Sequence, residues 1–377
     1  YNTVIVNRKK KERSTEMREK DYYEREHRSD ARRSSHSAQG AEHRGKKQHK
    51  RRKSRGERAA VTLLSLLFLT VAVVAAVKYV VRAPEPDAGK EDNKTEQDSA
   101  QQEDNDGIET IANGKERKKY CYTILLSGID NDAGGSDTNM LMRFDAENDT
   151  IDIVSLPRDS LMSNGHKLNY AYNNGGTDKL RSEIEDLLGV PVDFYVSVNL
   201  KGFVALIDQI GGVEFDVPCD MDYDDPYQDL HIHFKAGLQK LDGQKAMEVV
   251  RFRHNNDNTG YGGRQDLGRI ETQQAFLKAV AQKLMKLENL PAMAETFLKY
   301  VKTDLTLGNL VWLANEALSM GGMDAIHFAT LPGDGSGWYK GMSVYALDRE
   351  QVLEMTNLML NPYAAPLTAD EQNVLVP

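Results

Sequence analysis

The sequence predicts an α/β (α+β) fold, with a mixed central β-sheet flanked by helices, behind a single N-terminal transmembrane helix. Two observations lead to this prediction. An apolar run covers residues 59–81 and separates a basic arm from an acidic remainder. After residue 120, short apolar runs typical of strands alternate with segments of helical periodicity. Strands that alternate with helices favour a sheet covered by helices.

The apolar run at 59–81 has the roughly 20 residues that a membrane-spanning helix needs. The arm before it carries about 20 Lys and Arg against about 9 Asp and Glu, whereas the rest of the chain sums to about −20. Because positive residues stay on the cytoplasmic side, we expect a cytoplasmic N-terminus and an extracellular C-terminal part. The run begins too far from the N-terminus and is too long for a cleavable signal peptide. It is therefore predicted to be a signal anchor in the cell membrane.

Composition divides the chain into five segments. We predict a basic disordered cytoplasmic arm at 1–58, the anchor at 59–81, an acidic flexible stalk at 82–119, an extracytoplasmic domain at 120–362 and a C-terminal tail at 363–377. The stalk has almost no large apolar residue, so it cannot bury enough surface to offset the entropy of ordering. The basic arm fits topology determination best, and contact with anionic lipid or nucleic acid stays an alternative.

Strands are predicted where apolar residues run together or alternate between turn residues. A buried strand is expected first, and a turn at 147–149 joins the next two into a hairpin. A later strand follows Gly211 and Gly212, which end a helix. The predicted strands are 123–127, 140–144, 151–155, 192–198, 213–217 and 326–330.

Helices are predicted from apolar residues at helical spacing and from their end signals. Gly189 follows the end of the first, and Asp242 is placed to cap another. Two further helices are expected between the longest one and the last strand. Apart from those two, whose bounds are not assigned, the predicted helices are 177–188, 203–210, 242–250, 270–287 and 348–360.

Two carboxylates flank a glycine-containing loop after the first strand. Asp130 follows the strand directly, and Asp137 lies beyond Gly134 and Gly135. If the loop folds back, both carboxylates meet at one strand end and suit Mg²⁺, which binds through one or two protein oxygens plus substrate phosphates. Two solvated loop acids are an equally weighted alternative.

Cationic and amide side chains provide the second half of a candidate site. Arg158 sits at a strand end, and Arg251 and Arg253 would share one face if that segment is extended. Arg269 is expected to open the longest helix, with Gln273 one turn later. Guanidinium groups match phosphate oxygens, but each one alone is more often an ion-pair partner. Together with the acidic pair they indicate a Mg²⁺–pyrophosphate site.

Two other residue pairs are weaker candidates. His231 and His233 are two apart and could start a metal site, but a strand face is favoured because no Cys or third His is spaced to complete it. Cys121 and Cys219 are the only cysteines. A disulfide is permitted outside the cytoplasm, but two buried thiols are favoured.

Eight motifs occur in order along the chain, and together they resemble the LytR-CpsA-Psr family of cell-envelope phosphotransferases. They are Leu125–Asp130, Ser136–Thr138, Ser155–Asp159, Lys167–Ala171, Asp208–Val213, Leu241–Gly243, Val250–Arg253 and Asp266–Ile270. The ordered set covers roughly residues 121–285, and Leu331–Gly333 is similar to the family's end.

The resemblance implies transfer of an anionic glycopolymer, of teichoic acid or capsule type, from a polyprenyl-pyrophosphate carrier to a peptidoglycan acceptor. It also implies a hydrophobic pocket for the polyprenyl chain. Asp130 and Asp137 would hold Mg²⁺, and Asp137, Arg158 and Asp266 would be the catalytic residues, with Asp137 and Asp266 as candidate proton acceptors. The implied pyrophosphate-binding residues are Arg158, Arg251, Arg253, Arg269, Gln273 and, with a less defined role, Lys167. No nucleic-acid partner is expected.

Three positions depart from the family pattern: Asn131, Gly135 and Thr272 stand where many members carry Arg. These departures affect the number of phosphate ligands. Two other functions are compatible with the same residues. With water as the acceptor the domain would be a polyprenyl-pyrophosphate hydrolase, and without turnover it would be an envelope polymer-binding or regulatory module.

Overall fold

The structure is a computed structural model, and it describes residues 81–86, 114–129, 135–227, 230–286 and 290–377. All of these ranges lie in one compact unit, Leu69–Pro377. The predicted arm at 1–58, all but the last residue of the predicted anchor and most of the predicted stalk lie outside the described residues. Within the described ranges, no helix combines the length and apolar character needed to cross a membrane.

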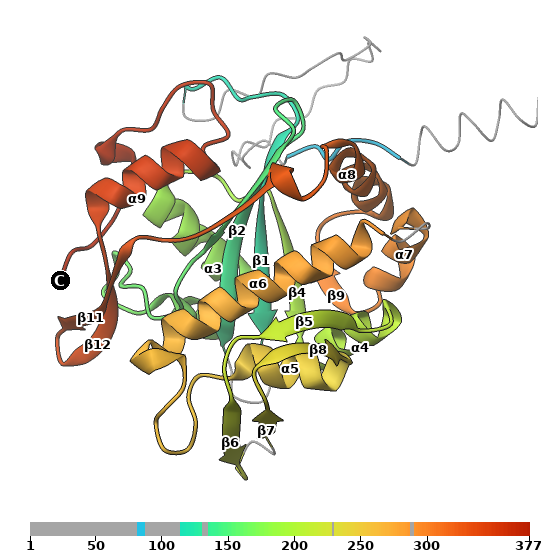
Figure 1. Cartoon of the computed structure of the whole chain (residues 1–377). Coiled ribbons are helices and arrows are strands. Elements are labelled where there is room, and N and C mark those ends of the chain that lie inside the picture. Colours follow the sequence, from blue (N-terminus) through green and yellow to red (C-terminus); the bar gives the residue numbers. More distant parts are fainter. Residues whose placement is uncertain (1–80, 87–113, 130–134, 228–229, 287–289) are drawn as a thin grey trace, which may run out of the picture. The chain divides into compact units, whose positions relative to one another are not determined.

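A six-stranded mixed sheet with the strand order β10-β3-β2-β1-β4-β9 forms the centre of the unit (Figure 1). Strands β1, β3, β4 and β10 run in one direction, and β2 and β9 run in the other. The carboxyl ends of β1, β3, β4 and β10 therefore meet the start of β2 at one end of the sheet. The strands are β1 (Cys121–Ile129), β2 (Ser136–Asp145), β3 (Thr150–Ser155), β4 (Phe194–Asn199), β9 (Val301–Thr303) and β10 (Ile326–Thr330).

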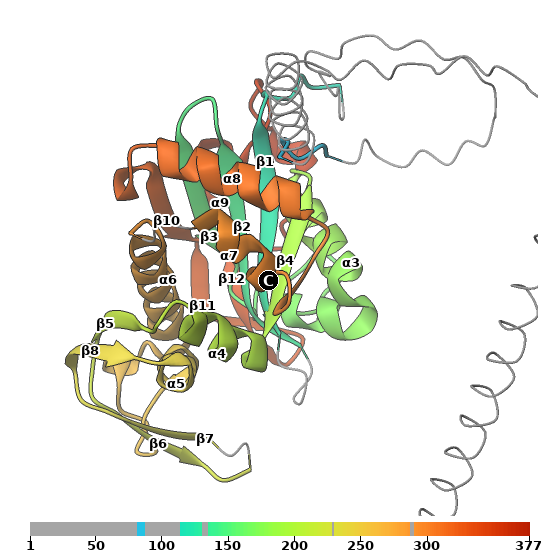
Figure 2. The same ribbon diagram turned by 90° about the vertical axis from the view of Figure 1, so that its right-hand side faces the viewer.

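Helices cover both faces of the sheet, as predicted (Figure 2). Helices α3 (Leu168–Leu188) and α9 (Arg349–Met355) pack on one face, and α6 (Gln265–Leu284) and α8 (Leu307–Ser319) pack on the other. Strand β1 shows why: Leu125 belongs to the core under α3, whereas its neighbour Ile124 belongs to the core under α8. Successive side chains of a strand point to opposite faces, so a buried central strand supplies both cores.

A third hydrophobic core lies beside the sheet, where two short strand pairs pack against helices. The pairs are β5 (Val213–Val217) with β8 (Gly237–Leu241), and β6 (Met221–Asp225) with β7 (Leu230–Phe234). They share this core with α5 (Gly243–Arg251), α6 and Ile207 of α4 (Leu200–Gln209). On α6, Phe276 stacks edge-on against Phe215 with ring centroids 5.4 Å apart, while the next residue, Leu277, contacts the sheet core. Helix α6 therefore joins the third core to the sheet.

The predicted mixed sheet and most predicted elements are confirmed. The turn at 147–149 joins β2 to β3, and Asp242 caps α5 by accepting a hydrogen bond from the Lys245 amide at 2.9 Å. Two helices, α7 (Leu290–Phe297) and α8, precede β10 as expected. Not predicted were strands β6, β8 and β9 and the hairpin of β11 (Gly333–Tyr339) and β12 (Met342–Leu347). The last predicted helix is α9 followed by a π-helical turn, Thr356–Leu360.

Helix α3 begins nine residues before the predicted start at residue 177. Gly175 and Gly176 have non-helical backbone angles inside it, with φ of +65° at Gly176. These two residues divide the helix into halves, and glycine is a poor helix former. The pattern therefore revealed only the second half, and it missed the first, which follows directly on Lys167.

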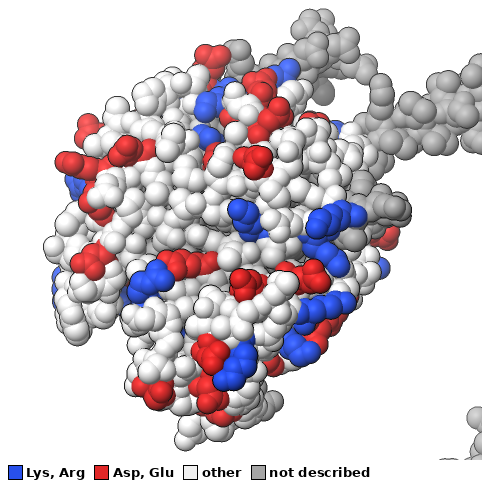
Figure 3. Space-filling view, in the orientation of Figure 1, with Lys and Arg blue, Asp and Glu red and all other residues white. Residues whose placement is uncertain are grey.

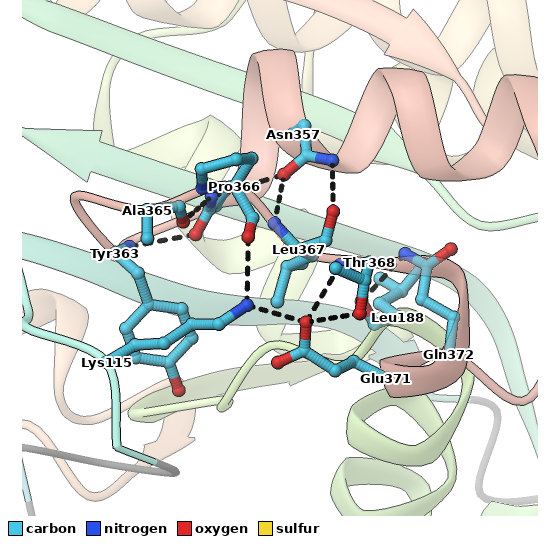
Figure 4. Close-up of polar contacts among 11 residues, drawn as sticks. Lys115, Leu188, Asn357, Tyr363, Ala365, Pro366, Leu367, Thr368, Glu371 and Gln372 are labelled. Carbon is cyan, nitrogen blue, oxygen red and sulfur yellow. Dashed lines mark hydrogen bonds and ion pairs between the residues drawn. The ribbon is translucent and has the colours of Figure 1, made fainter.

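Residues 363–377, predicted to be a tail, pack against the sheet and α3. Leu367 and Val374 are buried in the core under α3, and the Gln372 side chain donates to the Leu188 carbonyl at 2.8 Å. Figure 4 shows Lys115 reaching the same segment, with Nζ 2.6 Å from a Glu371 carboxylate oxygen. Residues 114–119 and 363–377 are thus held together by the Lys115–Glu371 ion pair and by backbone hydrogen bonds, such as that from the Ala364 amide to the Glu116 carbonyl at 3.0 Å.

Both cysteines are free. Cys121 is buried in β1, as expected, but Cys219 is only partly buried, so the prediction of two buried thiols is wrong for Cys219. Burial raises the pKa of the Cys121 thiol to about 12, which leaves it protonated at neutral pH.

Candidate active site

A cluster of acidic and basic side chains lies at the end of the sheet where four strand carboxyl ends meet. Asp137 is the second residue of β2, and Arg158 follows β3 by three residues. Their side chains form a charge-assisted hydrogen bond, with the Arg158 guanidinium donating to an Asp137 carboxylate oxygen. Residues 21 positions apart therefore meet because β2 begins where β3 ends. Asp137 thus lies in β2, directly after the glycine-containing loop, as expected.

Helix α6 contributes the second part of the cluster. Arg269 Nη2 lies 2.7 Å from Asp266 Oδ1, and Arg253 Nη2 lies 3.3 Å from the same oxygen. Helix α6 begins at Gln265, so Arg269 lies more than one turn inside the helix and does not open it, contrary to the prediction. The Arg269 side chain is almost completely buried. One carboxylate thus serves two guanidinium groups.

The loop between β3 and α3 contributes the third part of the cluster. Lys167 immediately precedes α3, and its Nζ lies 3.2 Å from Asp159 Oδ1. Arg158 Nε lies 3.7 Å from the same oxygen. The backbone amide of Asn169 also donates to the Arg158 carbonyl at 3.0 Å, so the start of α3 fixes the loop that carries Arg158.

Two glutamines hold α6 in place beside the cluster. Gln273 donates to the Val250 carbonyl near the end of α5 at 3.1 Å. Gln274 Nε2 lies within 3.0 Å of Ser155 Oγ, the Ala329 carbonyl and Thr330 Oγ1, at the carboxyl ends of β3 and β10. These contacts position α6 against the end of the sheet.

A small cavity of about 10 Å³ lies between these elements, enough for one water molecule. Its lining is mainly polar and comes from β2, β3, the following loop and α6. The lining residues are Asp137, Thr138, Asn139, Met140, Ser155, Leu156, Arg158, Asp266, Arg269, Ile270 and Gln273.

Three guanidinium groups of the cluster have a buried Nε–H that finds no acceptor among the described residues: Arg158, Arg253 and Arg269. A buried donor without an acceptor costs about 1–3 kcal/mol, and more when the group is charged. Burial also lowers the pKa of Arg269, with Arg253 and Arg158 acting in the same direction and Asp266 and Asp137 opposing them. An anion with several oxygens would supply acceptors for these donors and would relieve the repulsion between the guanidinium groups.

The oxygen donors in the cluster suit a hard divalent cation. Asp137 lines the cavity, and Mg²⁺ is held in proteins by one or two carboxylates together with waters and substrate phosphates. Asp130, the other predicted metal ligand, lies outside the described residues; it follows Ile129, the last residue of β1. The residues that the structure describes therefore fit a Mg²⁺ ion that completes its coordination with phosphate oxygens.

Arg251 and Arg253, two residues apart in the sequence, lie in different local structures. Arg251 is the last residue of α5, and its Nη1 lies 3.8 Å from Met247 Sδ within the helix. Arg253 lies two residues beyond the helix end and contacts Asp266. The prediction of a shared extended face is wrong because the helix continues through Arg251. Arg253 joins the charged cluster through its contact with Asp266.

Two residues of this region were not predicted to act there, Asp159 and Gln274. Both lie in or beside motifs already noted, directly after Arg158 and Gln273. The adjacency of opposite charges after a strand could have identified Asp159. On the face shown in Figure 3, acidic and basic side chains are interspersed, without a large patch of one sign.

Comparisons with known proteins identify related sequences and folds. The LytR_cpsA_psr family model matches residues 85–361. Teichoic acid transferase TagU of Bacillus cereus (strain ATCC 14579) is 30% identical over 67% of this chain and 82% of its own length. TagV of Bacillus subtilis (strain 168) is 31% identical over 50% of this chain, which spans about half (51%) of TagV. Both are named polyisoprenyl-teichoic acid–peptidoglycan teichoic acid transferases. The crystal structure of B. subtilis TagV matches with a TM-score of 0.55 and 26% identity over 63% of this chain and 94% of that one.

Proposed function

The chain belongs to the LytR_cpsA_psr family, and from that premise we propose that it is a membrane-anchored, Mg²⁺-dependent glycopolymer–peptidoglycan phosphotransferase. Its donor would be a glycopolymer of teichoic acid or capsule type on a polyprenyl-pyrophosphate carrier, and its acceptor peptidoglycan. The names of the TagU and TagV relatives support this chemistry. The anchor at 59–81 and the basic arm support a cytoplasmic N-terminus with the domain outside the cell membrane.

The observation that carries the proposal is the group of three arginines whose buried Nε–H donors find no acceptor in the described part of the chain. Phosphoryl transfer needs little more than positioning and neutralisation of charge on the non-bridging oxygens. Arg158 and Arg269 line the cavity, and Arg253 contacts Asp266 beside it. We assign these three residues to the pyrophosphate, with Arg251, Gln273 and Lys167 at the edge of the site.

The carboxylates have different partners and are therefore assigned different roles. Asp137 contacts a single guanidinium, that of Arg158, whereas Asp266 lies against Arg253 and Arg269. We assign Asp137 with Asp130 to Mg²⁺, and Asp266 to holding the arginines in place. Bound Mg²⁺ would neutralise charge that develops on the phosphate oxygens. An acceptor hydroxyl would attack the phosphorus next to the sugar and release polyprenyl phosphate, with Asp137 as the proposed proton acceptor.

The test uses the purified full chain with a short polyprenyl-pyrophosphate-linked saccharide, with and without Mg²⁺ and a peptidoglycan oligomer. We expect release of polyprenyl phosphate that requires both, and a loss of about 100-fold or more in Asp137→Asn. Asp324→Asn, at an exposed acid away from the cluster, is the matched control and is expected to keep full activity.

Two results would replace the proposal by another function. Mg²⁺-dependent release without acceptor would identify a polyprenyl-pyrophosphate hydrolase. Saturable donor binding without turnover under any condition would identify a polymer-binding or regulatory module. For such a module, substitution of Arg158 by alanine should weaken binding of the donor, and neither the parent nor the variant should release polyprenyl phosphate.

A further inference from the structure

The hairpin of β6 and β7 carries a cluster of imidazole and carboxylate groups that the proposed transfer does not use. In Figures 1 and 2 this hairpin projects beyond the end of the sheet. Asp222 lies opposite His233, and Asp224 lies opposite His231, in the antiparallel register. The four residues alternate with Met221, Tyr223, Leu230 and Ile232, which pack into the third core. One face of the hairpin is therefore anchored, and the other presents all four polar side chains to solvent.

Three ligand atoms of this face converge on one point. Asp224 Oδ1 lies 2.5 Å from His231 Nδ1 and 3.3 Å from His233 Nε2. One atom from each of the three residues lies within 4.8 Å of the others. Ligands of a tetrahedral zinc ion, bound at about 2.0–2.1 Å, are roughly 3.4 Å apart. These exposed side chains need only small rotations to reach that spacing.

Asp222 orients one of the imidazoles. Its Oδ1 lies 2.8 Å from Nδ1 of His233, so this carboxylate accepts the Nδ1–H hydrogen bond. The proton on Nδ1 leaves the lone pair on Nε2, the nitrogen that faces Asp224. A carboxylate that holds the far nitrogen of a histidine is the usual support of a metal-binding imidazole.

The hairpin backbone is held where these residues sit. The Asn255 side chain accepts from the Asp222 amide, and the Asn256 side chain accepts from the Asp224 amide, both at 2.7 Å. Asn256 also donates from its side chain to the Asp224 carbonyl at 3.1 Å. These bonds fix the β6 strand, so the carboxylates start from a defined backbone. Ordinary cross-strand pairs of charged residues need no such convergence of two imidazoles on one carboxylate oxygen.

We propose that the β6–β7 hairpin binds a divalent transition-metal ion of the Zn²⁺ class through His231, His233 and Asp224, with Asp222 orienting His233. Imidazole and carboxylate ligands suit Zn²⁺ and its neighbours, whereas Mg²⁺ prefers oxygen ligands alone. Three protein ligands leave one position for water. The site is separate from the proposed Mg²⁺–pyrophosphate cluster in both its residues and its ligand chemistry.

The test measures Zn²⁺ binding by calorimetry to the full chain without an affinity tag, at neutral pH and in millimolar MgCl₂. The basic arm contains four further histidines, so all proteins carry alanine at His27, His36, His43 and His49. We expect one Zn²⁺ per chain with a micromolar or lower Kd. Co²⁺ in place of Zn²⁺ should give a visible absorption spectrum characteristic of a four-coordinate ion.

Substitutions at the hairpin give the matched comparisons. His231→Ala, His233→Ala and Asp224→Ala should each weaken Zn²⁺ binding by about 100-fold or more, and Asp222→Ala by about 10-fold or more. His166→Ala, on a different loop, should bind as the parent does. Because the hairpin residues are exposed, circular dichroism of the metal-free variants should match the parent.

Two outcomes would overturn the proposal. One is the absence of saturable Zn²⁺ binding with a Kd below about 100 μM. The other is binding that changes less than about threefold in the His231→Ala/His233→Ala double variant. Unchanged affinity in Asp222→Ala would remove the orienting role assigned to that carboxylate.

Discussion

Replacement of Asp266 by asparagine should destabilise the domain as well as abolish transfer. Asp266 Oδ1 lies 2.7 Å from Arg269 Nη2, and the Arg269 side chain is only 7% exposed. Removal of one partner of a buried ion pair costs about 3–5 kcal/mol, because the other charge stays buried without compensation. The Asp266 side chain is 26% exposed, so solvent offsets part of this cost. We therefore expect a loss near the lower limit, about 3 kcal/mol.

The assay is thermal and urea unfolding of Asp266→Asn beside the parent. A change of 1 kcal/mol shifts Tm by about 2–4 °C in a domain of this size, so the expected decrease is about 6–12 °C. Glu271→Gln is the matched control because Glu271 lies on the same helix and pairs with Arg264 at 2.5 Å, with both side chains more than half exposed. An exposed pair contributes about 0–1 kcal/mol, so this variant should unfold almost as the parent does.

The two readouts separate two roles for Asp266. If Asp266→Asn unfolds within 1 kcal/mol of the parent, the assignment of this carboxylate as the counter-ion of Arg269 is refuted. If such a stable variant has also lost transfer, Asp266 returns as a candidate proton acceptor. A joint loss of stability and activity would support the positioning role.

Three further predictions concern Arg158, the Gln274 side chain that holds α6 against the sheet, and two buried groups with raised pKa, Cys121 and Tyr261. Arg158→Lys should lower transfer about 100-fold in the donor–acceptor assay, because an ammonium cannot bridge two phosphate oxygens; Arg264→Lys, at an exposed residue, should retain activity. Gln274→Ala should cost about 1–3 kcal/mol in urea unfolding, since three acceptors at the ends of β3 and β10 lose their donor; equal stability would contradict this. Burial raises the pKa of Cys121 and Tyr261 to about 12 in the folded chain. The folded state therefore holds these two protons more tightly than the unfolded state does, and their contribution to the free energy of unfolding is complete below the pKa of the unfolded groups. Stability should therefore fall as pH rises from about 9 to 12, by about 1.4 kcal/mol per pH unit and proton, and a flat alkaline profile would refute this.

The sheet could be predicted from the sequence because its strands have strong signals. Strands β1 to β3 each contain a short run of apolar residues, and a turn at 147–149 separates the second from the third. The missed strands lack these signals. Strand β11 contains three glycines and is mostly exposed, and β6 contains three aspartates. Their strand conformation depends on pairing and on the third core, which no local pattern reveals.

The helix boundaries near the site were the weakest part of the prediction. Arg251 is the last residue of α5, one residue beyond the predicted end of that helix, so the extended segment on which a shared face with Arg253 depended does not form. Helix α6 starts at Gln265 without a side-chain cap, so no capping residue marked its beginning. Gly268 also obscured the helix, yet its lack of a Cβ allows the Tyr261 ring to lie against the first turns of α6. The start of α6 therefore depends on packing against Tyr261, which no local pattern reveals.

With the true start of α6, the sequence itself shows which face of this helix carries the site. Asp266, Arg269, Ile270 and Gln273 follow the spacing i, i+3, i+4, i+7, and all four line the cavity. That spacing normally marks an apolar stripe facing a core. Here three of its four members are polar, while Phe276 and Leu277, further along the helix, are packed into two different hydrophobic cores. A polar stripe on a helix fixed by apolar residues in its next turn supports the proposed binding of pyrophosphate at this face.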